Sequence, residues 1–423
     1  MQRRNFLRLL SLPAALPAAA LAARERAARG SAPARITKVE AFVLRHPADD
    51  TPAEELIEMP PPGYMTGGLG LWNRLDHHSP SRFKGYTQAT LVKITTDQGL
   101  VGWGEAHAPA APRVHKAVIT DLFTPMLLGQ NALDVEVLWE RMYSTQRVRG
   151  YATGFYTESL AAVDLALWDI LGKYSGLPLY QLLGGKYRDR IPTYAAAGSP
   201  ESALKAIEAG FQAVKLGLSK GPGTNNVDRV AEVSAAIKGK GQLLVDSLGA
   251  YKLHEAVIVG RRLDQLGNIG WWEDALAPED LDGFPRLREA LDVPICAGEE
   301  ISNRYQFRDL FASRAVDIIN PDICRAGGIT ECHRIADLAD VHGVLWSPHV
   351  SSGTALYMSA SIHLAVATPN AVIMEGGGAH TRPFGNPLIK EPLEFSPGFA
   401  VVPERPGLGI EFDEDALARV TVG

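Results

Sequence analysis

Reactive side chains recur at nearly constant intervals in the second half of the sequence, each at the downstream end of a short apolar run. The intervals, taken as differences between residue numbers, lie between 23 and 31 residues. Such a length accommodates one strand, one helix and two loops. The side chains of this series are Lys215, Asp246, Glu273, Glu299, Asp322, His349 and Glu375.

Three successive members of the series, Asp246, Glu273 and Glu299, are carboxylates. Carboxylates that approach one another repel, and one of them must stay protonated unless a cation lies between them. A set of oxygen ligands with room for water and substrate suits Mg2+ best. Single acids are also common at helix N-termini. Three acids that follow one another at the spacing of successive strands instead predict a site for one Mg2+ ion.

The segments between these residues must position them. Apolar residues recur every three or four positions in stretches such as HEAVIVGRRLDQLG and GITECHRIADLADVHG, which predicts helices. Strands that alternate with helices indicate parallel βα units. The run IPTYAAA at 191–197 adds an eighth strand, the number that closes a (β/α)8 barrel. We therefore predict an α/β fold with a TIM-like barrel over 156–384, whose strand ends converge on an active site.

A smaller domain is expected over 35–155. ITKVEAFVLRH reads as a strand, and ATLVKITTDQGLVGWGEAH reads as a hairpin that turns at 97–99. The stretch YTESLAAVDLALWDILGKYSG predicts a helix laid against the barrel and ending at Gly176. The Pro- and Gly-rich tail, 385–423, is expected to pack back on this smaller domain.

The first 22 residues are expected to be a twin-arginine export signal. Arg3 and Arg4 are followed by x-Phe-Leu-Arg, then by a moderately apolar segment and the small-residue site Ala20-Leu21-Ala22. The mature protein would begin near Ala23 and lie in the periplasm. A misassigned start at Met1 and a free amphipathic helix are the alternatives.

The composition is that of a globular protein and argues against some classes of partner. Hydrophobic content of 46% and charged content of 21% are ordinary for a globular protein. The net charge of −6 argues against nucleic acid as a partner, and no apolar run is long enough for a membrane span in the mature form. The three cysteines, too few for a disulfide framework, are expected to be packing residues: Cys296, Cys324 and Cys332.

These motifs together resemble the enolase superfamily and, within it, the mandelate racemase-like subgroup (the mandelate racemase/muconate lactonizing enzyme family). The resemblance spans nearly the whole mature chain. It includes Gly-Trp-Gly-Glu at 102–105, ALWDILGKYSGLPLYQLLGG, the three acids, Pro-Asp-x-x-x-x-Gly-Gly-Ile-Thr and Ser-Pro-His. It implies an α+β capping domain built from both chain ends, Mg2+ on Asp246, Glu273 and Glu299, and removal of the proton next to a substrate carboxylate.

The remaining members of the series receive roles from this resemblance. His349 would be the base, with its tautomer set by Asp322 on the preceding strand. Glu375 resembles the carboxylic acid that hydrogen-bonds the enolate oxygen. Many relatives carry Lys-x-Lys where this chain has Lys215-Leu216-Gly217, so the second lysine is missing. Lys215 could pair with the substrate carboxylate or donate a proton to a leaving group.

The missing lysine favours a dehydratase over a two-base racemase. One base can abstract the α-proton, and the β-hydroxyl then leaves to give a 2-keto-3-deoxy acid. A cycloisomerase of a sugar lactone or anhydro-acid, an epimerase and a non-catalytic sugar-acid binder remain alternatives. Homo-oligomers are expected. The candidate substrate contacts are Tyr64, Trp72, Asn73, Arg74, His77 and His78 on a long loop, and Arg147, Arg149 and Tyr151 ahead of the barrel.

Overall fold

The computed structural model describes residues 32–46, 87–108, 111–218, 226–351, 353–378 and 382–422. Residues 34–423 form one compact unit. The predicted signal peptide and the predicted substrate contacts between Tyr64 and His78 lie outside the described residues. Within the described ranges, no helix combines the length and the apolar character that crossing a bilayer requires.

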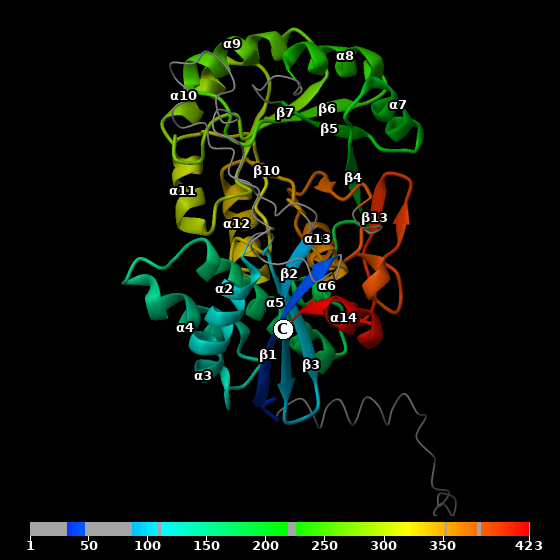
Figure 1. Ribbon diagram of the computed structural model, residues 1–423. Coiled ribbons are helices and arrows are strands. Elements are labelled where there is room, and N and C mark those ends of the chain that lie inside the picture. Colours follow the sequence, from blue (N-terminus) through cyan, green and yellow to red (C-terminus); the bar gives the residue numbers. More distant parts are fainter. Residues whose placement is uncertain are drawn as a thin grey trace, which may run out of the picture. The chain divides into compact units, whose positions relative to one another are not determined.

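An antiparallel sheet with the strand order β14-β1-β2-β3 forms the centre of the capping domain. β1 (Ile36–His46) pairs with β2 (Thr87–Thr96), and β2 pairs with β3 (Val101–Ala106) across the predicted hairpin turn. β14 (Thr421–Val422) pairs antiparallel with β1, so both ends of the described chain build this sheet. Figure 1 shows β1–β3 in blue and cyan, with the red C-terminal helix beside them. The expected return of the tail to this domain is therefore observed for its last segment, whereas an earlier part of the tail pairs with the barrel.

Helices follow β3 along the chain. The longest of them, α5, packs closely on β3, because a Cβ atom at Gly104 would lie 1.8 Å from the carbonyl oxygen of Ala162. α5 ends at Gly176 in the left-handed conformation, as predicted. The helical segments are α2 (Pro112–Ala117), the π-helix η2 (Val118–Phe123), α3 (Thr124–Leu127), α4 (Val135–Arg147), α5 (Phe155–Ser175) and α6 (Leu179–Leu182).

The helix α5 contacts both parts of the molecule. Besides packing on the capping sheet, it meets the barrel helix α12 through Asp164, whose carboxylate accepts hydrogen bonds from the main-chain N–H and the hydroxyl of Thr330. The sequence predicted that this helix lies against the barrel, and this is true of one of its two faces. The second face forms much of the core of the capping domain.

The predicted barrel is present. Successive strands from β4 to β10 pair in parallel, and β11 pairs with β4. An isolated bridge between Trp346 and Ala371 joins β10 to the segment ahead of β11 and completes the ring. The strands are β4 (Arg190–Ala196), β5 (Ala213–Gly217), β6 (Gln242–Asp246), β7 (Ile269–Glu273), β8 (Ile295–Ala297), β9 (Ile318–Ile319), β10 (Leu345–Trp346) and β11 (Met374–Glu375).

Helices connect the barrel strands (Figure 1). They are α7 (Pro200–Glu208), α8 (Val227–Ile237), α9 (Leu253–Asp264), α10 (Gly283–Ala290), α11 (Arg304–Ala312), α12 (Ile329–Val341) and α13 (Ala355–Ala367). In the tail, β13 pairs antiparallel with β4. The tail elements are η4 (Asn386–Leu388), β12 (Phe395–Ser396), β13 (Phe399–Val401) and α14 (Glu414–Val420).

The barrel interior shows why the reactive residues converge. One buried cluster consists of side chains contributed by successive barrel strands, namely Tyr194, Ala213, Leu244, Trp271, Cys296 and Ile318. Because side chains alternate along a strand, the residue two positions further on points to the same interior. On β5, β6 and β7 those residues are Lys215, Asp246 and Glu273. The apolar layer, called the barrel floor below, therefore lies directly beneath the side chains of Lys215, Asp246 and Glu273.

Candidate active site

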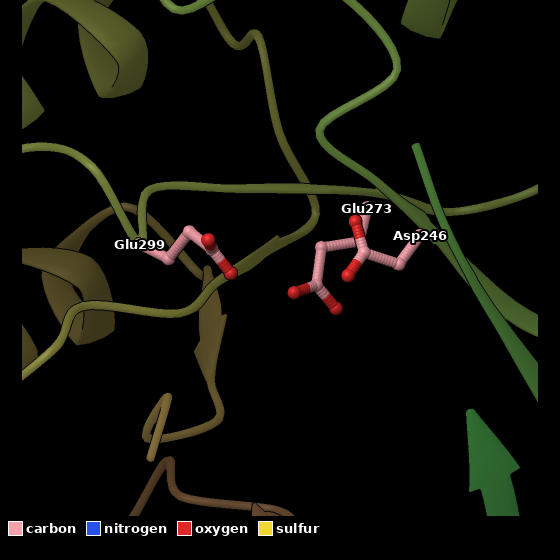
Figure 2. Close-up of side chains that lie close together, drawn as sticks. All are labelled: Asp246, Glu273 and Glu299. Carbon is pink, nitrogen blue, oxygen red and sulfur yellow. The ribbon is translucent and has the colours of Figure 1, made fainter. Parts of the chain in front are cut away.

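The carboxylates of Asp246, Glu273 and Glu299 converge, as the sequence predicts. One oxygen from each lies within 4.8 Å of the others. Figure 2 shows the three side chains extending toward a common space from separate segments of the barrel. Glu273 and Glu299 are buried, and Asp246 is half-buried.

Lys215 lies among these acids and does not face solvent freely. Its Nζ is 2.6 Å from Oε1 of Glu273 and 3.0 Å from Oδ2 of Asp246. Burial alone would lower the pKa of Lys215, but the surrounding negative charges, led by Glu273, raise it well above its usual value. The described site therefore holds a lysine ammonium between two of its three carboxylates.

Two neutral donors orient Glu273. The indole Nε1 of Trp271 donates to its Oε2 at 3.0 Å, and the side-chain amide of Asn320 donates to its Oε1 at 2.9 Å. Burial, the largest influence, raises the pKa of Glu273 despite the nearby Lys215. Trp271 belongs to the barrel floor and Asn320 follows β9, so the barrel itself sets the position of this carboxylate.

Glu299 faces the opposite side of the cluster. Its Oε2 lies 3.2 Å from Nε2 of His349, and its carbonyl oxygen accepts a hydrogen bond from Arg325 at 3.1 Å. Burial alone would raise the pKa of Glu299, but the positive charges of His349, Lys215 and Arg325 hold it below its usual value. The neighbouring Glu300 is exposed and is absent from the carboxylate cluster. The structure thus brings Glu299 into the cluster, as the sequence motif suggested.

His349 and Asp322 form a buried pair on adjacent strand ends. Nδ1 of His349 lies 2.7 Å from Oδ2 of Asp322, and the hydroxyl of Tyr357 donates to the same oxygen. Oδ1 of Asp322 accepts from the main-chain N–H of Cys324 at 2.8 Å. Burial alone would raise the pKa of Asp322, but the hydrogen bond from His349 and nearby positive charge hold it well below its usual range. An ionised Asp322 directs the proton of His349 to Nδ1 and leaves Nε2 toward the acid cluster.

The imidazole of His349 is strongly influenced by its acidic neighbours. Burial alone would lower its pKa, but the charge of Glu299 and the hydrogen bond to Asp322 raise it to about 9. Oε2 of Glu375 lies 3.6 Å from Nε2 of His349 and accepts a weak hydrogen bond from the main-chain N–H of Val350 at 3.4 Å. A divalent cation among the carboxylates would offset their charge and bring the pKa of His349 back toward neutrality. Glu375, Glu299 and His349 thus meet at one place.

The predicted contacts ahead of the barrel are exposed at the surface. Arg147 and Arg149 are exposed at the end of α4, and the guanidinium of Arg147 lies 5.7 Å from the centre of the Tyr143 ring. Tyr151 is exposed as well. No contact within the described ranges joins these three residues to the acid cluster, so their role in substrate binding stays a prediction.

Several residues around the site were missed by reasoning from sequence. Asn320 and Trp271 each precede a predicted site residue by two positions, so strand alternation could have identified them. Tyr357 lies on α13 and has no such signal. His107 and Arg325 form a further contact: Nη2 of Arg325 lies 3.0 Å from Nε2 of His107, whose Nδ1 lies 3.6 Å from Asp322.

The carboxylate cluster fits a bound cation. Its ligand atoms are all oxygens, they come from three consecutive strand ends, and two of them already contact the ammonium of Lys215. Burial raises the pKa of both Asp246 and Glu273, and repulsion from the neighbouring carboxylates adds to the rise despite the charge of Lys215. A hard divalent ion offsets such repulsion.

Two family models match the chain. The model of the mandelate racemase / muconate lactonizing enzyme N-terminal domain matches residues 80–184. The model described as enolase C-terminal domain-like matches residues 199–416. These matches cover the capping domain and the barrel in turn.

Curated relatives and solved structures agree with these models. D-galactarolactone cycloisomerase of Agrobacterium fabrum is 35% identical over 349 residues, covering 78% of this chain and 90% of that protein. D-galactonate dehydratase of Verminephrobacter eiseniae is 33% identical, covering 77% and 88%. The crystal structure of 3,6-anhydro-D-galactonate cycloisomerase from Zobellia galactanivorans superposes with a TM-score of 0.75 at 32% identity, covering 92% of this chain and all of that one. The chain therefore belongs to the mandelate racemase/muconate lactonizing enzyme family of the enolase superfamily.

Proposed function

We propose that the protein is a Mg2+-dependent acid-sugar dehydratase. It removes the proton α to a substrate carboxylate and expels the β-hydroxyl, which yields a 2-keto-3-deoxy acid. The observation that carries the proposal is the position of His349, whose Nε2 lies 3.2 Å from a cluster carboxylate while its Nδ1 is held by Asp322. A base beside a cation site is the arrangement that α-proton abstraction requires.

Each residue has a distinct task in this reaction. Asp246, Glu273 and Glu299 would hold the Mg2+ ion, which when bound stabilises negative charge that develops on the substrate carboxylate. Nε2 of His349 takes the α-proton, and Asp322 orients the ring and stabilises the imidazolium that forms. His349 or Lys215 then protonates the departing β-oxygen.

Elimination suits the site better than racemisation by two bases. Racemisation needs a second base on the opposite face of the substrate, and Gly217 stands where relatives carry the second lysine of Lys-x-Lys. A Cβ atom at Gly217 would meet no atom within 4 Å, so the described structure leaves space there instead of a functional group. The remaining lysine, Lys215, is paired with two acids.

A second candidate is a cycloisomerase, which the names of two relatives favour. In a lactone or an anhydro-acid, the β-oxygen belongs to a ring. The same α-proton abstraction and β-elimination would open that ring without loss of water, so substrate and product would have equal mass. The two candidates therefore share every residue of the mechanism and differ only in the leaving oxygen.

Product analysis in D2O tests the proposal. The Mg2+-loaded protein is incubated with D-galactonate, arabinonate, D-galactarolactone and 3,6-anhydro-D-galactonate, the compounds that the relatives' names contain. Loss of the α-proton with a new 3-deoxy methylene and loss of water supports the dehydratase. The same methylene without loss of water, at a mass that differs from the substrate only by deuterium taken up from solvent, favours the cycloisomerase, and deuterium at the α-carbon alone indicates an epimerase.

Substitution of the base gives the matching control. His349→Asn should abolish turnover, whereas His254→Asn, at an exposed position of α9, should retain it. Turnover by His349→Asn at the rate of the wild type would refute the assignment of the base. No exchange with any compound would exclude the dehydratase for this set of substrates.

We also propose that the protein is exported to the periplasm and assembles into a homo-oligomer. The first proposal is supported by the arginine pair Arg3-Arg4, the apolar segment and the small-residue site that follow it. If the wild-type chain stays in the cytoplasm to the same extent as an Arg3→Lys, Arg4→Lys variant, the proposal of export is contradicted. Sedimentation equilibrium of the mature protein tests the second.

A further inference from the structure

The capping strand β3 presents different residues to its two sides. Gly102 and Gly104 face α5, where any side chain would strike the helix backbone. Glu105 accepts hydrogen bonds from Thr354, which follows His349 in the chain. Because side chains alternate along a strand, the glycine packing on α5 fixes where the other side of β3 meets the barrel.

His107, directly after β3, connects this strand to the base. Its main-chain N–H donates to the carbonyl oxygen of Cys324 at 3.3 Å. Its Nε2 lies 3.0 Å from Nη2 of Arg325. A guanidinium can only donate hydrogen bonds, so Nε2 accepts and the proton of the neutral ring is on Nδ1. Burial, aided by the charge of Arg325, lowers the pKa of His107 to about 3, and the ring is therefore neutral.

The protonated Nδ1 of His107 faces Asp322. The distance to Oδ2 is 3.6 Å, which is too long for a hydrogen bond but close for a dipole and a charge in a buried place. This nitrogen has no hydrogen-bond partner among the described residues. The same oxygen of Asp322 accepts from His349 and Tyr357. Oδ2 of Asp322 is thus approached by two donors of the barrel and by one residue of the capping domain.

We propose that His107 is a positioning residue for the base: it joins Arg325 to Asp322 and holds that carboxylate where it orients His349. The inference rests on the proposed function, because it assigns His107 to the same proton abstraction. It also makes the capping domain necessary for the geometry of the base, in addition to any contact with substrate.

Three variants separate this role from simple packing. If His107 served packing alone, only the shape of its ring would matter. The centre of that ring lies 6.4 Å from the centre of the Tyr357 ring, in an edge-on arrangement. His107→Phe keeps an aromatic ring and removes both polar contacts. His107→Asn retains an N–H donor near the position of Nδ1, whereas His107→Gln retains an acceptor near the position of Nε2.

A matched control is available on α13. His363 is also fully buried, burial lowers its pKa to about 3, and its Nδ1 accepts from the main-chain N–H of Tyr180 rather than contacting Asp322. His363→Phe therefore reports what the loss of a buried neutral histidine does by itself.

Kinetics give the first readout. We expect His107→Phe to lower kcat by about 10- to 100-fold, the usual effect of removing a partner behind a functional group, with KM changed by less than about twofold. His107→Asn should recover most of kcat, and His107→Gln should not. His363→Phe should keep kcat within roughly twofold. A kcat of His107→Phe near that of the wild type, or an equal loss in all three His107 variants, would overturn the proposal.

A second readout does not depend on turnover. In Mg2+-loaded protein with nitrogen-15 histidine, ring couplings report which nitrogen carries the proton. We expect His107 as the Nδ1–H tautomer, and a shift of the His349 Nδ1–H resonance in His107→Phe but not in His363→Phe. If these resonances behave so while no sugar acid is converted, the proposed function fails and the positioning role stands. An Nε2–H tautomer of His107, or an unchanged His349 resonance in His107→Phe, overturns the role whatever the substrate.

Discussion

At the scale of the residue, Asp322 decides which nitrogen of His349 can accept a proton. The carboxylate accepts the Nδ1 proton at 2.7 Å, so in the neutral ring it is Nε2, on the side of the acid cluster, that can accept a proton. An asparagine at this position would donate its amide proton to Nδ1 and move the ring proton to Nε2. We therefore expect Asp322→Asn to lower kcat by about 10³- to 10⁴-fold, as the wrong tautomer does in other His–Asp pairs.

The same variant should leave the carboxylate cluster in place. Steady-state kinetics give kcat, and a Mg2+ titration with a melting curve shows whether the site and the fold persist. A kcat that falls by less than roughly fivefold, in a variant that still binds Mg2+, would mean that Asp322 does not set the tautomer.

A second prediction at this scale concerns two neighbouring acids. Glu299 is buried within the carboxylate cluster, whereas Glu300 is exposed outside it. Glu299→Gln removes one charged oxygen from the cation site, and we expect Mg2+ affinity to fall at least about 10-fold, because Mg2+ is held chiefly by carboxylate oxygens. Glu300→Gln should change it by less than roughly threefold, since an exposed charge is screened by solvent. Isothermal titration of both variants measures this, and equal losses would remove the distinction between the two acids.

At the scale of the element, β3 depends on two glycines for its place. A Cβ atom at Gly104 would lie 1.8 Å from the carbonyl oxygen of Ala162 in the backbone of α5, so α5 and β3 must separate to admit it. We expect Gly104→Ala to lower the free energy of unfolding by at least about 3 kcal/mol, the upper range for overpacking. Because β3 leads into His107, activity of the folded fraction should fall as well.

A glycine in open space provides the comparison. Gly198 has no atom within 4 Å of an added Cβ and does not have the left-handed conformation. Gly198→Ala should therefore change the free energy of unfolding by no more than about 0.5 kcal/mol. Urea denaturation of both variants tests the difference, and similar values for the two would show that β3 and α5 adjust easily.

At the scale of the whole molecule, buried carboxyl groups make stability depend on pH. Burial raises the pKa of Glu105 from 4.5 to about 7, despite hydrogen bonds from Thr354. Since the folded state holds this proton more tightly than the unfolded state, the group stabilises the fold at low pH. That stabilisation is lost as pH rises from about 4.5 through about 7, and amounts to roughly 3 kcal/mol.

Glu105→Gln removes this titration, because an amide stays neutral. We expect the free energy of unfolding of the variant, relative to the wild type, to increase between about pH 5 and pH 8. Asp164 shifts in the same direction but is present in both proteins, so its effect cancels in the difference. Urea denaturation across this range provides the measurement, and a difference that stays constant with pH would show that Glu105 is ionised in the folded protein.

The sequence by itself determined the barrel and the order of the groups along it. Apolar runs and helical periods are local patterns, and their regular spacing indicates eight βα units without knowledge of any contact. Alternation along a strand then places Asp246 and Glu273 above the apolar interior, so their meeting with Glu299 could be predicted. The hairpin at 97–99 and the end of α5 at Gly176 were also predictable, because turn and cap residues act over a few positions.

Only the tertiary structure decided which distant groups touch. It paired Lys215 with Glu273 and Asp246, and it brought Tyr357 to Asp322. It also joined His107 to Arg325 across 218 positions of sequence. No local pattern encodes such contacts, because they arise where the capping strand and the barrel are packed together. Burial and the charged neighbours of each group follow from the same packing, and together they set the charges of these groups and hence the chemistry that they can perform.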